Sequence, residues 1–215
     1  MPDLPAGNRL ERIAGEIAAR GFACCDQFVT RELSTALKHE SLALLARGEF
    51  RAAAVGTGRR RGVRPEIRGD QTLWITEPYA PAVQILMRQL ETLRLELNRT
   101  LTLGLFDLEV HFACYPPGGS YERHFDQFGD DAARTLSLVL YLNEGWREAE
   151  GGALRLYLAQ RSDSPSLDFL PAAGRLVVFL SAQFAHEVLP ATRERLSVTG
   201  WFRRRVMARE RGSGP

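Results

Sequence analysis

Cysteine and histidine are both scarce in this chain of 215 residues, which contains three cysteines and four histidines. Cys24, Cys25 and Cys114 cannot form a disulfide framework, because the two vicinal residues are too close in sequence for ordinary bridge geometry. The sequence also lacks a run of about 18 apolar residues that would span a bilayer, and its N-terminal stretch lacks the apolar segment of a signal peptide. We therefore expect a cytoplasmic protein with reduced thiols and no membrane partner.

A strong charge of one sign is absent as well, since 28 basic residues face 26 acidic ones and leave a net charge of +2. Arginine is nevertheless concentrated in two segments, which contain Arg59, Arg60, Arg61, Arg64 and Arg68, and Arg203, Arg204, Arg205, Arg209 and Arg211. These segments lack the interleaved aromatic residues of a single-strand binding platform, so a basic module that binds nucleic acid is the weakest alternative and we expect no nucleic-acid partner. The abundance of Ala, Arg and Leu over Lys indicates a bacterial source.

The N-terminal half of the sequence predicts three helices. Apolar residues recur at helical spacing over residues 9–20, 31–47 and 81–99. Thr30 is a suitable N-cap and Gly48 a suitable stop for the second helix, and Pro81 suits the first turn of the third. Between the second and third helices, Gly and Arg alternate with little apolar periodicity, which predicts a mobile loop over about 55–70 that leads into a strand.

From residue 108 onward, short runs of β-branched, aromatic and leucine residues are separated by Pro, Gly and Asp clusters. These runs are LEVHFACY, TLSLVLYL, ALRLYL, RLVVFL and RLSVTGWFR. Strands at this density predict an antiparallel barrel or sandwich. The length suits one domain, so we expect a single α+β domain with helical support over 1–107, a β core over 108–205 and a tail over 206–215.

Two histidines and one aspartate form a candidate metal site. His124 and Asp126 are separated by one residue, and such residues point the same way in an extended strand. His186 follows a predicted apolar strand about sixty residues later, where it can return beside the first pair. Two histidines and one carboxylate leave three positions open on a metal, as in non-haem iron(II) oxygenases. Taken singly, each of the three also fits a plainer role as a solvated or core polar residue.

Arg195 distinguishes between these interpretations, because it begins the last predicted strand nine residues after His186. A guanidinium is the side chain best matched to bidentate binding of a carboxylate. By period-2 alternation, the strand face that carries Arg195 also carries Ser197, Thr199, Trp201 and Arg203. Tyr141 ends the polar face of a second strand, and His111 and Tyr115 share a face of a third. These polar faces predict a barrel that holds one small ligand beside the metal.

Residues from about 108 to 203 resemble the prolyl 4-hydroxylase type of 2-oxoglutarate- and iron(II)-dependent dioxygenase, and most of all the bacterial relatives of the hypoxia-inducible-factor prolyl hydroxylases. The segments that match are ACYPPGGSYERHFD, LYLNEGW, GGALRL and HEVLPATRERLSVTGWF, together with the more N-terminal IRGDQTLWI. The resemblance implies a double-stranded β-helix, which is a jelly-roll-like barrel with the N-terminal helices packed on one side.

The resemblance also implies roles for single residues. His124, Asp126 and His186 match the Fe(II) ligands, and Arg195 matches the residue that pairs with the distal carboxylate of the cosubstrate 2-oxoglutarate. The other matching positions are Tyr141 and Thr199, which hydrogen-bond the same carboxylate, and Tyr115, Leu154, Trp201 and Tyr121, which line the pocket. The Arg-rich segment of about 55–70 takes the place of the loop that closes over the substrate in this family.

The chain departs from the family in two places. The loop between Tyr115 and His124 is shortened, and His111 stands where animal relatives carry a larger apolar residue. His111 either lines the pocket or accepts a local hydrogen bond.

The function implied by the resemblance is hydroxylation of a prolyl residue in another protein, with O2 consumed and a 4-hydroxyprolyl product. Elongation factor Tu is a candidate substrate for a bacterial relative, ascorbate is a candidate reductant, and the expected state is a monomer. Two alternatives stay open. One is a hydroxylase of another amino acid or small molecule on the same barrel, and the other is a non-catalytic module that senses a metal or 2-oxoglutarate.

Overall fold

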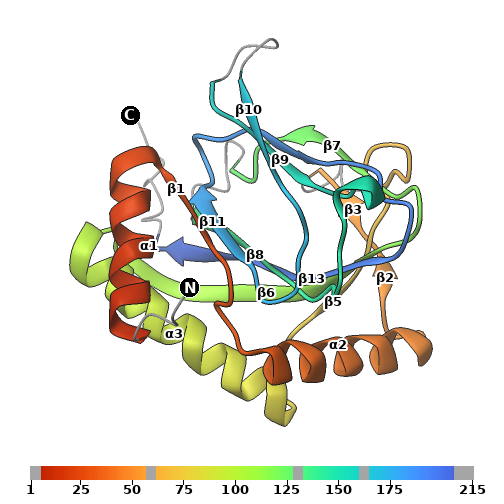
Figure 1. Cartoon of the computed structure of the whole chain (residues 1–215), viewed down its shortest axis with the longest axis horizontal. Coiled ribbons are helices and arrows are strands. Elements are labelled where there is room, and N and C mark those ends of the chain that lie inside the picture. The colour runs from red at the N-terminus through yellow and green to blue at the C-terminus, as the bar shows by residue number, and fades with distance from the viewer. Residues whose placement is uncertain (1–5, 57–61, 128–132, 160–164, 206–215) are drawn as a thin grey trace, which may run out of the picture.

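A computed structural model describes residues 6–56, 62–127, 133–159 and 165–205 of the chain (Figure 1). The helices are α1 (Ala6–Arg20), α2 (Arg31–Ala46), α3 (Pro81–Leu101) and the short 3₁₀ helix η2 (Glu148–Glu150). The strands are β1 (Phe22–Cys25), β2 (Arg51–Ala52), β3 (Ala54–Val55), β4 (Gly62–Val63), β5 (Gln71–Trp74), β6 (Leu105–Tyr115), β7 (Tyr121–His124), β8 (Arg134–Tyr141), β9 (Leu154–Tyr157), β10 (Ser166–Phe169), β11 (Leu176–Leu180), β12 (His186–Val188) and β13 (Arg195–Arg204).

The three predicted helices are present with boundaries close to those expected. Thr30 caps α2, because its side-chain oxygen accepts a hydrogen bond from the backbone N–H of Leu33. Pro81 occupies the first turn of α3, and Thr102 ends that helix in the left-handed conformation, with φ of 49°. The buried stripe of α3 is the one that the spacing predicts, namely Val83, Leu86, Leu90, Leu93 and Leu97. Local sequence therefore sets the helices.

Two sheets face each other and form the barrel. The larger sheet has seven strands in the order β1-β11-β8-β13-β6-β5-β2, and the smaller has four in the order β10-β9-β12-β7. Strand β13 lies between β6 and β8 and pairs antiparallel with both, over most of its length. In Figure 1 the helices lie on one side of the larger sheet, and the smaller sheet lies on the other.

Alternation along the strands divides the apolar residues into two cores. One face of β8 carries Leu136, Leu138 and Leu140, which pack with α1, α2 and α3. The opposite face carries Val139 and Tyr141, which pack between the two sheets. Because both faces are covered, the larger sheet holds a fixed register. The polar residues that point between the sheets are therefore held on a rigid framework.

Three features differ from the expectations. The segment of about 55–70 was expected to be a loop, yet its described part includes β4, which pairs with β3, and Arg68, which forms a bridge with Tyr121. The strand expected around His124 ends at that residue, so Asp126 lies just beyond β7. Strands β1, β10 and β12 were not predicted, because three or four residues are too few to display a period.

Within the described residues, no helix combines the length and the apolar character that crossing a membrane requires.

We predict that Leu93→Ala destabilises the protein by about 2–5 kcal/mol, because it leaves a cavity under α3 where the leucine side chain is fully buried. Leu95→Ala is the matched control on the same helix, because Leu95 is 55% exposed and its loss costs less than about 0.5 kcal/mol. Urea unfolding of both variants measures the difference. Equal losses of stability would contradict the assignment of the buried face of α3.

Candidate metal centre

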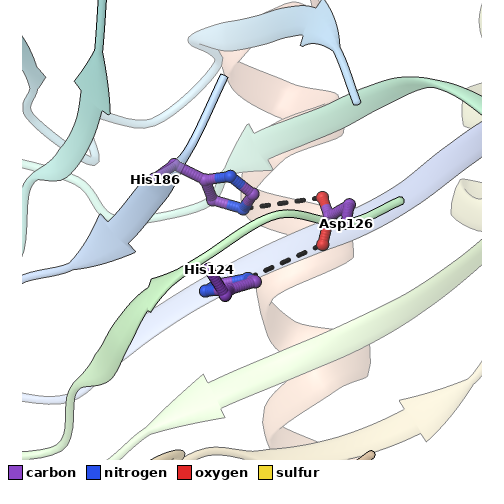
Figure 2. Close-up of side chains that lie close together, drawn as sticks. All are labelled: His124, Asp126 and His186. Carbon is purple, nitrogen blue, oxygen red and sulfur yellow. Dashed lines mark ion pairs between the residues drawn. The ribbon is translucent and has the colours of Figure 1, made fainter. Parts of the chain in front are cut away.

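His124, Asp126 and His186 converge at the open side of the smaller sheet (Figure 2). His124 ends β7 and His186 begins the neighbouring strand β12, where the two residues are paired partners in the register. Each of the three side chains offers one ligand atom, and these atoms lie within 4.8 Å of one another. The carboxylate stands between the rings, 3.6 Å from Nε2 of His124 and 3.5 Å from Nε2 of His186. The structure thus brings together the three residues that the sequence singled out.

Backbone carbonyl groups orient both imidazoles. Nδ1 of His124 lies 2.7 Å from the carbonyl oxygen of Glu122, and Nδ1 of His186 lies 3.3 Å from that of Phe184. A carbonyl only accepts, so each Nδ1 carries the hydrogen and donates it, which leaves each Nε2 with its lone pair directed at the shared point. This is the arrangement by which proteins fix histidine ligands to metals.

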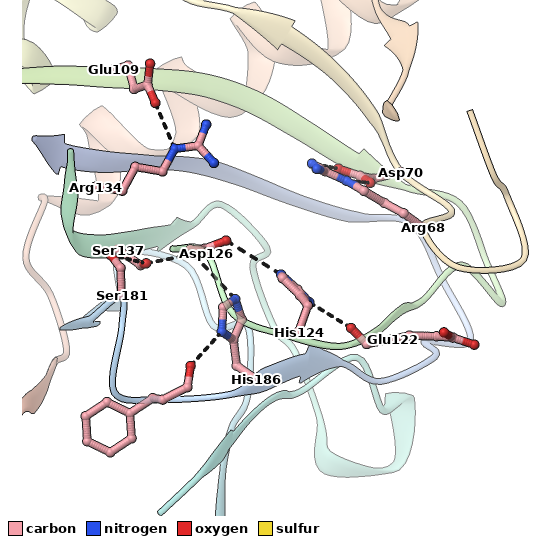
Figure 3. A network of polar contacts seen from close by, with 11 residues as sticks. Arg68, Asp70, Glu109, Glu122, His124, Asp126, Arg134, Ser137, Ser181 and His186 are labelled. Carbon is pink, nitrogen blue, oxygen red and sulfur yellow. Dashed lines mark hydrogen bonds and ion pairs between the residues drawn. The ribbon is translucent and has the colours of Figure 1, made fainter. Parts of the chain in front are cut away.

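Two serines hold the carboxylate from the other side (Figure 3). Ser137 on β8 donates a hydrogen bond of 2.7 Å to Oδ2 of Asp126, and its hydroxyl lies 2.9 Å from that of Ser181. Ser137 and Ser181 are both buried. Period-2 alternation puts Ser137 on the same face of its strand as Tyr141, but this pattern alone indicates no role in the site. Only the position of β8 beside Asp126 reveals that role.

Burial and neighbouring charges change the acidity of the triad. Burial alone would raise the pKa of the Asp126 carboxyl, but His186, His124 and the Ser137 hydroxyl together lower this pKa well below its usual value. Burial, and next the neighbouring His124, lower the pKa of His186 to about 4. At neutral pH the site therefore offers one carboxylate and a neutral His186, which are the protonation states that a divalent metal requires.

A cavity extends from the triad toward Arg195. The Arg195 side chain is buried, its Nε donates to the carbonyl oxygen of Gly152 at 2.9 Å, and its guanidinium carbon lies 5.1 Å and 5.0 Å from the ring centroids of Tyr115 and Tyr141. Among the described residues, no acidic side chain forms an ion pair with Arg195. A buried cation without an acidic partner is costly, so this end of the cavity is suited to bind an anion.

The lining of the cavity also contains an ion pair that was not predicted from the sequence. Arg68 donates two hydrogen bonds to the buried carboxylate of Asp70, at 2.7 Å and 3.0 Å, and its guanidinium carbon lies 4.8 Å from the ring centroid of Tyr121. Figure 3 shows this pair together with the triad, and the Tyr121 ring that Arg68 faces stacks on His124 with centroids 3.6 Å apart. Arg68 and Asp70 both belong to the segment IRGDQTLWI, which the sequence analysis noted only as a family match. The mutual bidentate pairing fixes the segment against the cavity.

Most of the predicted pocket residues lie where they were expected. The predicted residues that line the cavity are Tyr115, Tyr121, Leu154, Thr199 and Trp201, together with the triad and Arg195. Tyr141 is not among the lining residues, because it lies fully buried against Arg195. The Oγ1 of Thr199 lies 3.2 Å from the hydroxyl of Ser197. Arg59, Arg60 and Arg61 of the expected closing loop lie outside the described residues, as do Arg209 and Arg211 of the tail.

The donor set fits Fe(II) on chemical grounds. Two imidazole nitrogens and one carboxylate oxygen on a single face are the ligands of non-haem Fe(II) oxygenases, and they leave open positions for a second ligand. Cysteine sulfur, which would favour other metals, is absent from this group of ligands.

Comparisons with known proteins agree with this chemistry. The profile of the 2OG-Fe(II) oxygenase superfamily matches residues 110–203. The prolyl hydroxylase EGLN3 of Homo sapiens is 30% identical over 203 residues, which cover 90% of this chain and 82% of that protein. The chain belongs to the prolyl hydroxylase family of 2OG-Fe(II) oxygenases.

Solved structures of prolyl hydroxylases share the architecture. A crystal structure of a Pseudomonas putida prolyl-4-hydroxylase has 45% sequence identity and a TM-score of 0.83, and the match covers 92% of this chain and 100% of that one. A Trichoplax adhaerens prolyl hydroxylase, in complex with a peptide fragment of the hypoxia-inducible-factor oxygen degradation domain, has 27% identity, a TM-score of 0.81 and coverage of 92% and 90%. These matches confirm the predicted double-stranded β-helix and the prolyl hydroxylase type.

The match to some curated relatives covers only part of their length. Egl nine homolog 1 of Mus musculus is 29% identical over 202 residues, which cover 90% of this chain but only 49% of that relative. The chain thus spans about half the length of this relative.

We predict that Ser137→Ala weakens metal binding about 10- to 100-fold, because Asp126 loses the hydrogen bond that orients its carboxylate. Ser34→Ala is the matched control, because Ser34 is equally buried but lies in α2, outside the site. Calorimetric titration of the metal-free protein with Mn(II) measures both affinities. An unchanged affinity in Ser137→Ala would show that the serine only fills space.

We further predict that the metal-free protein loses stability as the pH falls from about 6.5 toward 4. His186 is buried and neutral, so over this range the unfolded chain binds a proton that the native state does not, and the free energy of unfolding rises with pH. The slope from this residue is at most about 1.4 kcal/mol per pH unit. Urea unfolding at a series of pH values, with His186→Leu for comparison, measures the slope. An equal slope in that variant would exclude His186 as its source.

Proposed function

We propose that this prolyl hydroxylase homologue uses Fe(II) and 2-oxoglutarate to hydroxylate a prolyl residue in a protein substrate, giving a 4-hydroxyprolyl product. The observation that carries the proposal is the buried guanidinium of Arg195, which lines the cavity of the triad and has no acidic partner in the part of the chain that the structure describes. 2-Oxoglutarate matches this arrangement, because it has an oxo acid at one end that chelates a metal and a carboxylate at the other end for an arginine. A site that bound only a metal would not need such a cation.

Each group of side chains has a separate task in the proposed reaction. His124, Asp126 and His186 hold Fe(II), while Arg195 fixes the distal carboxylate of the cosubstrate. Thr199 hydrogen-bonds the same carboxylate, Tyr141 packs against the guanidinium of Arg195, and Tyr115, Leu154 and Trp201 enclose the cosubstrate. When bound, Fe(II) and 2-oxoglutarate supply the oxidising chemistry, in which one atom of O2 enters the substrate C–H bond, the other enters succinate, and carbon dioxide is released.

The protein surroundings serve this chemistry by excluding water and positioning the target. The cavity is walled by apolar and aromatic side chains such as Val139, Leu154 and Val188, so that reacting groups are held in a site with few water molecules. The paired side chains Arg68 and Asp70 stand at the rim, where a polypeptide substrate would enter. We propose the segment of about 55–70 as the element that closes over that substrate.

The proposed substrate is a proline of elongation factor Tu, with ascorbate as the reductant that keeps the iron in its Fe(II) state. The support for a polypeptide substrate is that a similar prolyl hydroxylase, from Trichoplax adhaerens, was solved with a peptide fragment bound. A single domain, a monomeric state and a cytoplasmic location stay predictions.

We predict that Arg195→Ala raises the KM for 2-oxoglutarate at least about 100-fold, because the distal carboxylate loses a buried bidentate partner. Arg155→Ala is the matched control, since Arg155 pairs with Asp168 on the outer surface of the smaller sheet. Succinate formation with Fe(II) and O2 measures the effect, with His186→Ala as the inactive reference. Comparable turnover in Arg195→Ala would remove the main support for the cosubstrate assignment.

The protein substrate can be identified in cells that contain or lack the gene. Peptides of elongation factor Tu should gain the mass of one oxygen atom on a proline only when the gene is present. Purified enzyme should then add the same modification to unmodified elongation factor Tu. If the modification appears on a different protein, the substrate assignment changes while the reaction stands. If cells with and without the gene contain the same hydroxyprolyl residues in all proteins, prolyl hydroxylation itself is contradicted.

A further inference from the structure

His111 is a buried polar side chain that the proposed reaction has not yet used. It lies on β6, lines the cavity and is only 2% exposed. Neither of its ring nitrogens has a hydrogen-bond partner within the described structure. Burial, and next the charge of Arg68, lower the pKa of His111 to about 3, so its ring is neutral at physiological pH. A neutral imidazole has one N–H donor and one acceptor nitrogen, and leaving them unpaired costs stability.

The rows of the larger sheet place His111 between the two ends of the cavity. Same-face residues on neighbouring strands form cross-strand rows, which are about 7 Å apart along the strands. The row of Tyr115 and Arg195 marks the anion-binding end, and the row of Ser137 and Trp201 marks the metal end, because Ser137 bonds to Asp126. His111 belongs to an intermediate row, opposite Thr199. A dicarboxylic acid that binds Arg195 with one carboxylate and the metal with the other therefore lies across the row of His111 and Thr199.

Trp74 packs against His111 on the neighbouring strand β5. The indole of Trp74 is 45% exposed, and its ring centroid lies 4.9 Å from that of His111. On the inner side, the ring of Trp201 lies 5.6 Å from His111, and its buried Nε1 also lacks a partner. Asp126 is near enough to act electrostatically on His111. His111 is thus covered toward solvent and available toward the metal side.

We propose that His111 donates an N–H hydrogen bond to the carboxylate through which a 2-oxo acid chelates the metal. A carboxylate that binds a metal through one oxygen retains a second oxygen, which needs a donor in a closed cavity. His111 and Thr199 are the neutral donors on the row that the ligand crosses, and Thr199 is assigned with Arg195 to the distal carboxylate, which leaves His111 for the chelating end. The inference rests on the proposed function, since it assigns a partner to one end of the same cosubstrate. His111 is accordingly a positioning residue for the chelating end.

The test compares donor-free and donor-bearing variants. In His111→Leu the ring is replaced by an apolar side chain, whereas His111→Gln keeps an N–H donor; His111→Met is a second donor-free variant in case the first does not fold. Calorimetric titration of 2-oxoglutarate into the Mn(II)-loaded protein should give a Kd about 10- to 100-fold higher for the donor-free variants and within about threefold of wild type for His111→Gln. Mn(II) affinity should be unchanged in all of them.

Two further readouts separate positioning from a purely structural role. Under anaerobic conditions, the visible charge-transfer band of 2-oxoglutarate chelated to Fe(II) should shift in the donor-free variants and return in His111→Gln. The metal-free donor-free variants should unfold at equal or higher urea concentrations than wild type, because the unpaired buried nitrogens are removed. If His111 served only the fold, its replacement would instead lower the urea concentration at which the metal-free protein unfolds. The charge-transfer band would then stay unchanged.

The outcomes distinguish this inference from the proposed function. If wild-type protein binds Mn(II) but not 2-oxoglutarate, the proposed function fails and the inference fails with it. If wild type binds 2-oxoglutarate and the donor-free variants bind it equally well, only the inference is overturned. It is also overturned if the donor-free variants weaken the binding of the protein substrate alone, because His111 would then face that substrate.

Discussion

The pairing of β13 with both β6 and β8 is the constraint on which the site depends. Antiparallel pairing on two sides fixes which residues of the three strands face the cavity. Arg195 at one end of β13 and Trp201 near the other are thereby held at set positions relative to Ser137 on β8. Since Ser137 contacts Asp126, the same register also sets the metal site against the anion-binding end. A shift by one residue would turn Arg195 into the helical core.

The metal site itself joins elements that have little structure of their own. Strands β7 and β12 are four and three residues long, and Asp126 lies outside any strand. Their ligands converge because β12 pairs with β7 on one side and β9 on the other, while carbonyl groups and serine hydroxyls fix the side chains. Because neighbouring strands hold these short segments, the positions of the three ligands are fixed. The same arrangement leaves coordination positions of the metal open.

The parts of this protein that a sequence predicts are those governed by a local period. The α3 stripe and the inward face of β13 follow from spacings of 3.6 and 2 residues, and both were recovered. The triad was predicted because His124 and Asp126 are one residue apart and His186 follows an apolar strand that can return beside them, and the family resemblance implied the same set. Ser137 and the ion pair of Arg68 with Asp70 were missed as parts of the site. The roles of these residues depend on which strands become neighbours in the fold. The spacing of residues within one segment does not predict that.

His111 illustrates a second limit of prediction from sequence. Alternation placed it on the cavity side, but its unpaired nitrogens could not be known before its surroundings were, because any nearby carbonyl or hydroxyl would have satisfied them. Tyr141 shows the reverse, since its face was predicted correctly although it lies behind Arg195 rather than on the cavity surface.

The aromatic side chains at the cavity entrance have an optical consequence. Of the three tryptophans in the chain, Trp74 and Trp201 stand beside the cavity, with ring centroids 6.3 Å apart, and Trp146 donates its indole N–H to the carbonyl of Gly151. Trp74 is partly exposed and Trp201 is buried, so the two indoles sample different polarity. The protein therefore carries one intrinsic fluorophore in the cavity wall and a second packed close to it, and occupancy of the cavity is open to observation without a label.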